Sequence, residues 1–147
     1  MNQVSKTLQW LREYAAHYEQ GQDAHAAMAA FGIFGAAISP DYGGLGFSRR
    51  HLLQVFEQLG AIDIALAASA IVHYNATQAI SRHGTEQQKR TLLTEIIAGQ
   101  RKVSFSLTEP GAGSNLRGIK SYADPCERGY HLFGQKAYCG GAQAADT

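Results

Sequence analysis

A strand-like run followed by a glycine-rich turn is the part of this sequence whose composition is best suited to chemistry. Val103, Phe105 and Leu107 alternate with serine and threonine, which is the period-two pattern of a β-strand. The run breaks at Pro110, and the loop Gly111-Ala-Gly-Ser114 follows. Bare glycine backbone and a serine hydroxyl can bind an anion at close range. This arrangement is suited to holding a flat ring with a phosphate tail, although Pro-Gly after a strand is more often simply a turn.

The order of residues in this stretch resembles the signature of a known enzyme family. Leu107-Thr-Glu-Pro-Gly-Ala-Gly-Ser114 is similar to the signature of the acyl-CoA dehydrogenases. Three more stretches resemble motifs of that family in the same order: Ile38-Ser-Pro-Asp-Tyr-Gly-Gly-Leu-Gly46, His83-Gly-Thr-Glu-Gln-Gln-Lys89 and Tyr130-His-Leu-Phe-Gly-Gln-Lys136. Because these motifs span about residues 30 to 146, the chain is identified as a member of the acyl-CoA dehydrogenase family.

The resemblance implies an FAD-dependent oxidoreductase. In this family a carboxylate removes the α-proton of an acyl thioester while the β-hydrogen moves as hydride to flavin N5. FAD carries the redox chemistry and the protein orients it. The thioester is carried on CoA or on a carrier protein, and the electrons pass to an electron-transfer flavoprotein or another acceptor. The family's base comes from a carboxy-terminal helical bundle, so no residue of this chain is assigned as the catalytic base.

The resemblance also assigns residues to the cofactor and the substrate. Thr108 is expected to hydrogen-bond the polar edge of the flavin, and Gly113 with Ser114 is expected to bind the FAD pyrophosphate. The alternative reading of Thr108 is a strand-end residue that caps the following turn. Phe105 and Ser114 are also expected to contact the acyl thioester. The cofactor-binding residues expected from the resemblance are Phe105, Leu107, Thr108, Gly113, Ser114 and Tyr138.

Several positions depart from the family pattern. Tyr138 stands where tryptophan usually packs against the flavin, and Gly140 stands where a threonine hydroxyl usually lies near flavin N5. Asn115 replaces a common aspartate. These changes leave open a flavin-dependent oxidase or monooxygenase of the same superfamily. Glu109 is expected to order the loop before Pro110 and not to act as a base.

Composition and charge exclude several classes of protein. The 147 residues are 45% hydrophobic and 17% charged, so the chain can bury a core and is not typical of a disordered protein. A net charge of +1 predicts neither a nucleic-acid partner nor an anionic membrane surface. No apolar run is long enough to span a bilayer, and the amino terminus lacks the layout of a secretory signal. Cys126 and Cys139 have no metal-like spacing, which predicts a reduced, cytoplasmic protein without a metal site.

Helical periodicity dominates the first two-thirds of the sequence. Ser48 is a candidate N-cap, and Thr85 with Gln88 forms the pattern of a capping box. His73 and Asn75 could face a substrate pocket, although a lone histidine is more often a hydrogen-bonded structural residue. Tyr42 to Gly46 is expected to be a sharp structural loop. The predicted helices cover residues 5–20, 23–31, 49–59, 63–82 and 86–99.

From residue 102 the period changes from helical to alternating. The predicted strands are 102–108, 117–124, 129–134 and 135–139. The predicted fold class is α+β, with an all-helical amino-terminal domain over residues 1–100. Residues 101–147 are expected to form the first strands of an incomplete, β-barrel-like middle domain, which the resemblance implies is the flavin-binding part. The resemblance implies further strands and a helical bundle in the full-length protein, which is expected to be a homo-oligomer. A non-catalytic remnant or interaction module is the alternative.

Overall fold

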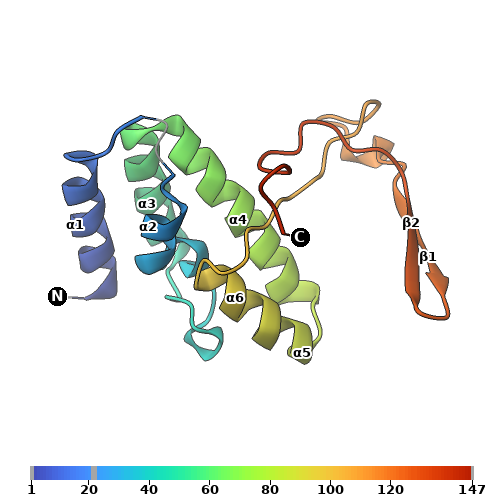
Figure 1. Cartoon of the computed structure of the whole chain (residues 1–147), viewed down its shortest axis with the longest axis horizontal. Helices are drawn as coiled ribbons and strands as arrows, with labels where there is room; N and C mark the ends of the chain where they lie inside the picture. The colour runs from blue at the N-terminus through green and yellow to red at the C-terminus, as the bar shows by residue number, and fades with distance from the viewer. Residues whose placement is uncertain (1, 21–22, 147) are drawn as a thin grey trace.

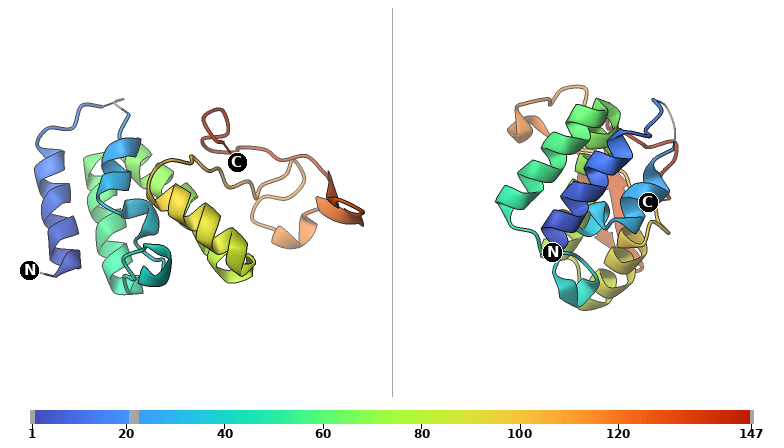
Figure 2. Two further views of the ribbon diagram at one scale, coloured as in Figure 1. Left: turned by 60° about the horizontal axis from the view of Figure 1, so that its bottom comes forward. Right: turned by 90° about the vertical axis from the view of Figure 1, so that its left-hand side faces the viewer.

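The computed structural model describes residues 2–20 and 23–146. A body of helices carries a two-stranded antiparallel hairpin that projects away from it (Figures 1 and 2). This arrangement confirms the α+β class. The helices are α1 (Gln3–Ala15), α2 (His25–Ala30), α3 (Arg49–Ile62), α4 (Ile64–His83), α5 (Glu86–Gln88) and α6 (Thr94–Ile97), with short turns η1 (Ile33–Gly35), η2 (Pro40–Tyr42), η3 (Lys89–Leu93, π-helical) and η4 (Leu116–Gly118), and the strands are β1 (Tyr122–Cys126) and β2 (Gly129–Phe133).

The helix starts follow the local capping chemistry. The Ser48 hydroxyl accepts a hydrogen bond from the backbone of His51 at 3.4 Å, as predicted. Thr85 and Gln88 form both halves of the capping box, which confirms the start of α5. Asp63 caps α4 through the backbone of Ala65 at 2.8 Å. Each cap satisfies amide groups that the first turn of a helix leaves without an intrahelical partner.

The core of the body lies around α3, which packs between α1 and α4 (Figure 1). Leu52, Val55 and Leu59 form the buried stripe of α3. Phe34 of η1 is almost fully buried and stacks on His73 of α4 with ring centroids 4.1 Å apart. Burial of these apolar side chains is the main stabilising term for the helices.

The first two helices are shorter than predicted. Helix α1 ends at Ala15, and Tyr18 lies beyond it, where its hydroxyl donates to the Asp63 carboxylate at 3.0 Å. This tertiary contact therefore replaces the extra helical turn expected over residues 16–20. At the start of α2, Ala24 occupies the N-cap position, and the Asp23 carboxylate accepts a hydrogen bond from the backbone amide of His25 at 2.9 Å.

The helix predicted after Thr85 is interrupted by the π-helical turn η3. Leu93 and Ile96 are fully buried on either side of its end. A π-turn inserts an extra residue into the helical ladder and thus changes which side chains share a face. The segment ends at Gly99 as predicted: its φ of 72° is left-handed, and an added Cβ would lie 2.5 Å from the Cβ of Ala29.

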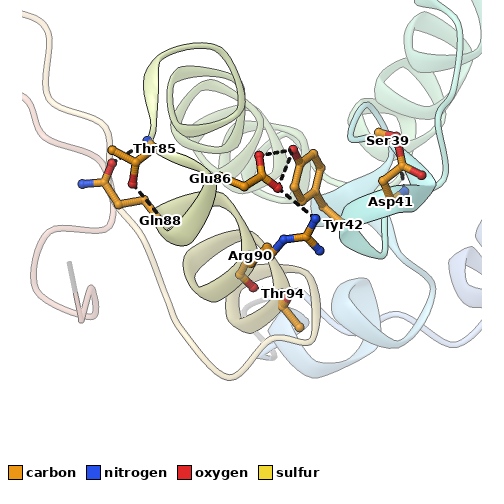
Figure 3. A network of polar contacts seen from close by, with 8 residues as sticks. All are labelled: Ser39, Asp41, Tyr42, Thr85, Glu86, Gln88, Arg90 and Thr94. Carbon is orange, nitrogen blue, oxygen red and sulfur yellow. Dashed lines mark hydrogen bonds and ion pairs between the residues drawn. The ribbon is translucent and has the colours of Figure 1, made fainter.

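Hydrogen bonds join the loop at Tyr42 to Glu86 at the start of α5 (Figure 3). The Tyr42 hydroxyl donates to the Glu86 carboxylate at 3.0 Å, and Arg90 pairs with Glu86 at 3.0 Å. The neighbouring Glu86 carboxylate raises the pKa of Tyr42. A Cβ at Gly44 would collide with the carbonyl of Ile38, so this turn requires glycine. These contacts agree with the predicted structural role of the loop.

Three of the four predicted strands are wrong in extent. Residues 102–108 are extended but form no ladder, and residues 135–139 form no strand either. The strand predicted over 117–124 is displaced to β1, because η4 occupies its start. Strand β2 agrees with the prediction for 129–134, and it pairs with β1 from Tyr122 opposite Phe133 to Cys126 opposite Gly129. An alternating pattern forms a strand only where a partner is in register.

We expect Leu59→Ala to lower the free energy of unfolding by about 2–5 kcal/mol, because it opens a cavity at a side chain with no exposed surface. Urea unfolding followed by circular dichroism measures this change. Leu53→Ala is the matched control, since it makes the same change on the same helix at a side chain that is 69% exposed. Equal losses for the two variants would contradict the placement of the core.

Candidate functional site

The glycine-rich signature is a tight turn at the end of an extended segment. Glu109 and Ala112 exchange two backbone hydrogen bonds of 3.1 and 3.0 Å across Pro110 and Gly111. Ala112 is buried, whereas Gly113 and Ser114 are exposed. An added Cβ at Gly111 or Gly113 would meet no atom within 4 Å. The turn therefore presents bare backbone and a serine hydroxyl to open space.

The Glu109 side chain holds this turn to the following segment. It is only 7% exposed, and its two carboxylate oxygens accept from the backbone of Lys120 at 2.7 Å and of Ser121 at 3.0 Å. The Lys136 ammonium donates to the same carboxylate at 2.8 Å. The hydrogen bond from Lys120, followed by that from Lys136, lowers the pKa of Glu109 from 4.5 to about 2. An ionised, fully engaged carboxylate orders the loop and is a poor proton acceptor.

A second segment, residues 136–140, lies beside the extended run. The backbone of Ala137 donates to the carbonyl of Thr108 at 2.9 Å. The Lys136 ammonium also donates to the carbonyl of Leu107 at 3.2 Å. At the far end the Ser104 hydroxyl donates to the carbonyl of Gly140 at 2.9 Å. The two segments are thus joined mainly by hydrogen bonds of side chains and not by the backbone hydrogen bonds of a β-ladder.

These contacts decide which of the expected site residues come together. Phe105 and Thr108 are half-buried, and Leu107 is exposed. Tyr138 directly follows Ala137, so it lies beside the end of this run; it is 95% exposed and has a left-handed φ of 54°. The structure therefore places Tyr138 beside Thr108, at the end of the extended run that carries Phe105 and Leu107. Gly113 and Ser114 lie on the exposed turn that follows.

Cys139 contacts the same segment. Its sulfur lies 2.8 Å from the Ser104 hydroxyl, and this hydrogen bond lowers the pKa of the Cys139 thiol. Cys126 and Cys139 are both free cysteines. Within residues 2–20 and 23–146, no group of three or more histidine, cysteine or acidic side chains could hold a metal ion.

A pocket of about 360 Å³ adjoins this region. It lies between the start of α2, one face of α4 and the two segments around Val103 and Gly140, and its walls are mostly apolar. His73 lines it, whereas Asn75 does not. The Nδ1 atom of His73 lies 3.0 Å from the Ser69 carbonyl, and burial lowers the pKa of this histidine. These contacts agree with the structural reading of His73, although its ring also lines a pocket.

Sequence reasoning missed three polar residues of this pocket. Asp23, His25 and Lys102 line it, and the Lys102 ammonium lies 3.6 Å from the Asp23 carboxylate. The Nε2 atom of His25 lies 3.2 Å from the carbonyl of Gly99. No local pattern marks these residues, because the pocket joins chain segments that are far apart in the sequence.

Comparison with known proteins identifies the family. The sequence model of the acyl-CoA dehydrogenase amino-terminal domain matches residues 4–100. The chain belongs to the acyl-CoA dehydrogenase family. It is 29% identical to the mitochondrial isovaleryl-CoA dehydrogenase of Solanum tuberosum over 89% of its own length and 32% of that protein. It is 30% identical to the mitochondrial very long-chain specific acyl-CoA dehydrogenase of Rattus norvegicus, over 85% of the chain and 20% of the relative.

A solved structure has a similar fold. The structure of PigA with FAD and proline superposes with a TM-score of 0.84 at 25% identity, over 99% of this chain and 42% of that one. The chain thus spans about a third of the length of the isovaleryl-CoA dehydrogenase that it matches. Among the described residues, no helix is long and apolar enough to cross a membrane.

We expect the backbone amides of Lys120 and Ser121 to report the ionisation of Glu109. Because its pKa is lowered in the fold, the stabilisation is complete above pH 4.5 and is lost as the pH falls toward about 2. The amide chemical shifts of these two residues should titrate with a midpoint near 2 in NMR spectra, and Glu109→Gln should abolish the titration. A midpoint near 4.5 in the native chain would contradict the contacts described for this carboxylate.

Proposed function

We propose that this chain supplies the helical part and the flavin-facing segments of an FAD-dependent, acyl-CoA dehydrogenase-like oxidoreductase. The reaction is the α,β-dehydrogenation of an acyl thioester. The proposal rests on family membership together with one geometric observation. The Thr108 carbonyl and the Ala137 amide are hydrogen-bonded at 2.9 Å, so the two segments assigned to the flavin lie side by side.

The residues of the signature turn fit a cofactor with a flat ring and a pyrophosphate. Gly111 and Gly113 leave space for close approach of an anion to the backbone, and the exposed Ser114 adds a hydroxyl donor. Thr108 and the exposed aromatic ring of Tyr138 are available for the ring system. FAD would supply the hydride acceptor, and these side chains would bind and orient it. Phe105 and Ser114 are the proposed contacts to the thioester.

The acyl group is proposed only as a class. The two relatives described above are named for isovaleryl-CoA and for very long-chain acyl-CoA, which differ greatly in length. The carrier is CoA or a carrier protein, and the electron acceptor is an electron-transfer flavoprotein or another acceptor. We propose a cytoplasmic location and, for the full-length protein, a homo-oligomeric state. Residues 1–100 and 101–147 are proposed as the helical domain and the beginning of the middle β-domain.

We expect Ser114→Ala to weaken FAD binding by about 10- to 100-fold, because a hydrogen bond to a charged phosphate is lost. The quenching of flavin fluorescence on titration with protein measures this affinity. Ser5→Ala on the exposed face of α1 is the matched control and should bind FAD as the native chain does. FAD binding that is absent in the native chain, or equal in Ser114→Ala, would refute the proposed site.

We expect the 147-residue chain by itself to give no turnover of acyl thioesters above that of free flavin. The reason is that Glu109, the carboxylate of the signature, is engaged by three donors that lower its pKa to about 2, so it is too weak a base to remove an α-proton. The assay combines the chain, FAD, a panel of acyl-CoA substrates and an artificial electron acceptor. Dye reduction that depends on acyl-CoA would show that this chain contains a base after all.

A further inference from the structure

We propose that Lys136 is a positioning residue that sets the spacing between the two segments assigned to the flavin; this inference rests on the proposed function. Its ammonium donates at once to the Leu107 carbonyl at 3.2 Å and to the Glu109 carboxylate at 2.8 Å. Both acceptors lie on the segment that carries Thr108. The next residue, Ala137, donates its amide to Thr108, and Tyr138 follows directly.

The buried state of Glu109 gives this contact its strength. The carboxylate is 7% exposed, whereas the Lys136 side chain is 30% exposed. Hydrogen bonds between ionised partners are shorter and stronger than those between neutral groups. The backbone amides of Lys120 and Ser121 each bind one oxygen of the carboxylate, so the orientation of Glu109 is fixed. Lys136 donates to the same oxygen as Ser121 and reaches the Leu107 carbonyl from there.

Few other interactions could take over this role. From residue 115 to residue 146, no apolar side chain of the described structure is fully buried, so the region lacks a core that would position the second segment. Near the signature turn, the Ala137–Thr108 hydrogen bond also joins the two segments. At the far end they are joined by the contacts of the Ser104 hydroxyl to Gly140 and Cys139 and by the two hydrogen bonds between Lys102 and Asp146. Lys136 acts at the end nearest to the signature turn, where the proposed flavin contacts converge.

The test compares Lys136→Met, Lys136→Arg and the native chain. Methionine keeps much of the apolar stem and removes the cation, whereas arginine keeps the charge. Lys6→Met, which removes an exposed lysine of α1, is the control for net charge. The first measurement needs no cofactor: amide hydrogen exchange of Ala137 should be faster in Lys136→Met, close to native in Lys136→Arg and unchanged in Lys6→Met.

The second measurement concerns the cofactor. Lys136→Met should weaken FAD binding by about tenfold or more and change the visible absorption bands of FAD at saturation, without removing any group assigned to FAD. Partial rescue by Lys136→Arg is expected. The double variant Glu109→Gln/Lys136→Met should lose less free energy of FAD binding than the sum of the losses of the two single variants, because the two residues act as a pair.

The outcomes separate this inference from the proposed function. If the native chain binds no FAD, the proposed function fails, and the exchange of Ala137 still decides whether Lys136 joins the two segments. If Lys136→Met and Lys6→Met show the same rate of amide hydrogen exchange at Ala137 and the same affinity for FAD, the inference is overturned while the proposed function stands. If exchange changes but the affinity and the absorption bands of bound FAD do not, Lys136 has only a structural role and the inference is likewise overturned.

Discussion

The conformation of residues 101–146, here called the signature region, depends on the ionised carboxylate of Glu109. Between residues 101 and 146, the buried side chains are Val103, Glu109 and Ala112, so there is too little apolar surface for a core. A buried carboxylate requires hydrogen-bond partners, and its demand is met by two backbone amides and one ammonium group. Electrostatic contacts therefore organise the segments that hydrophobic burial organises elsewhere in the chain.

The helical body follows the opposite rule. Its order comes from apolar stripes on α3 and α4 and from Phe34, with polar caps only at the helix ends. This difference gives the two regions distinct sensitivities. Acid and salt weaken the ionic contacts that hold the signature region, whereas substitutions that open cavities weaken the apolar packing of the helices. The proposed FAD site lies in the region that depends on charge.

Local chemistry made the helices predictable and long-range pairing made the strands unpredictable. Ser48 and Thr85 mark helix starts because a cap needs only neighbours in the sequence. The run from 102 to 108 alternates correctly, but its partner segment pairs with it by a single backbone hydrogen bond at Thr108. The grouping of Phe105, Thr108 and Tyr138 followed from family resemblance, whereas the Lys136 contacts and the pocket residue His25 depend on tertiary structure that no local pattern encodes.

The two ends of the signature region meet at one place on the helical body. Lys102 and Asp146 are joined by two hydrogen bonds of 2.8 Å, from each backbone amide to an oxygen of the other residue. The chain between them is thus a long excursion that leaves and returns beside α4 (Figure 1). Since the junction fixes both ends, insertions or changes of shape within the excursion need not be transmitted to the helices, and the cost of a longer loop grows only slowly with its length.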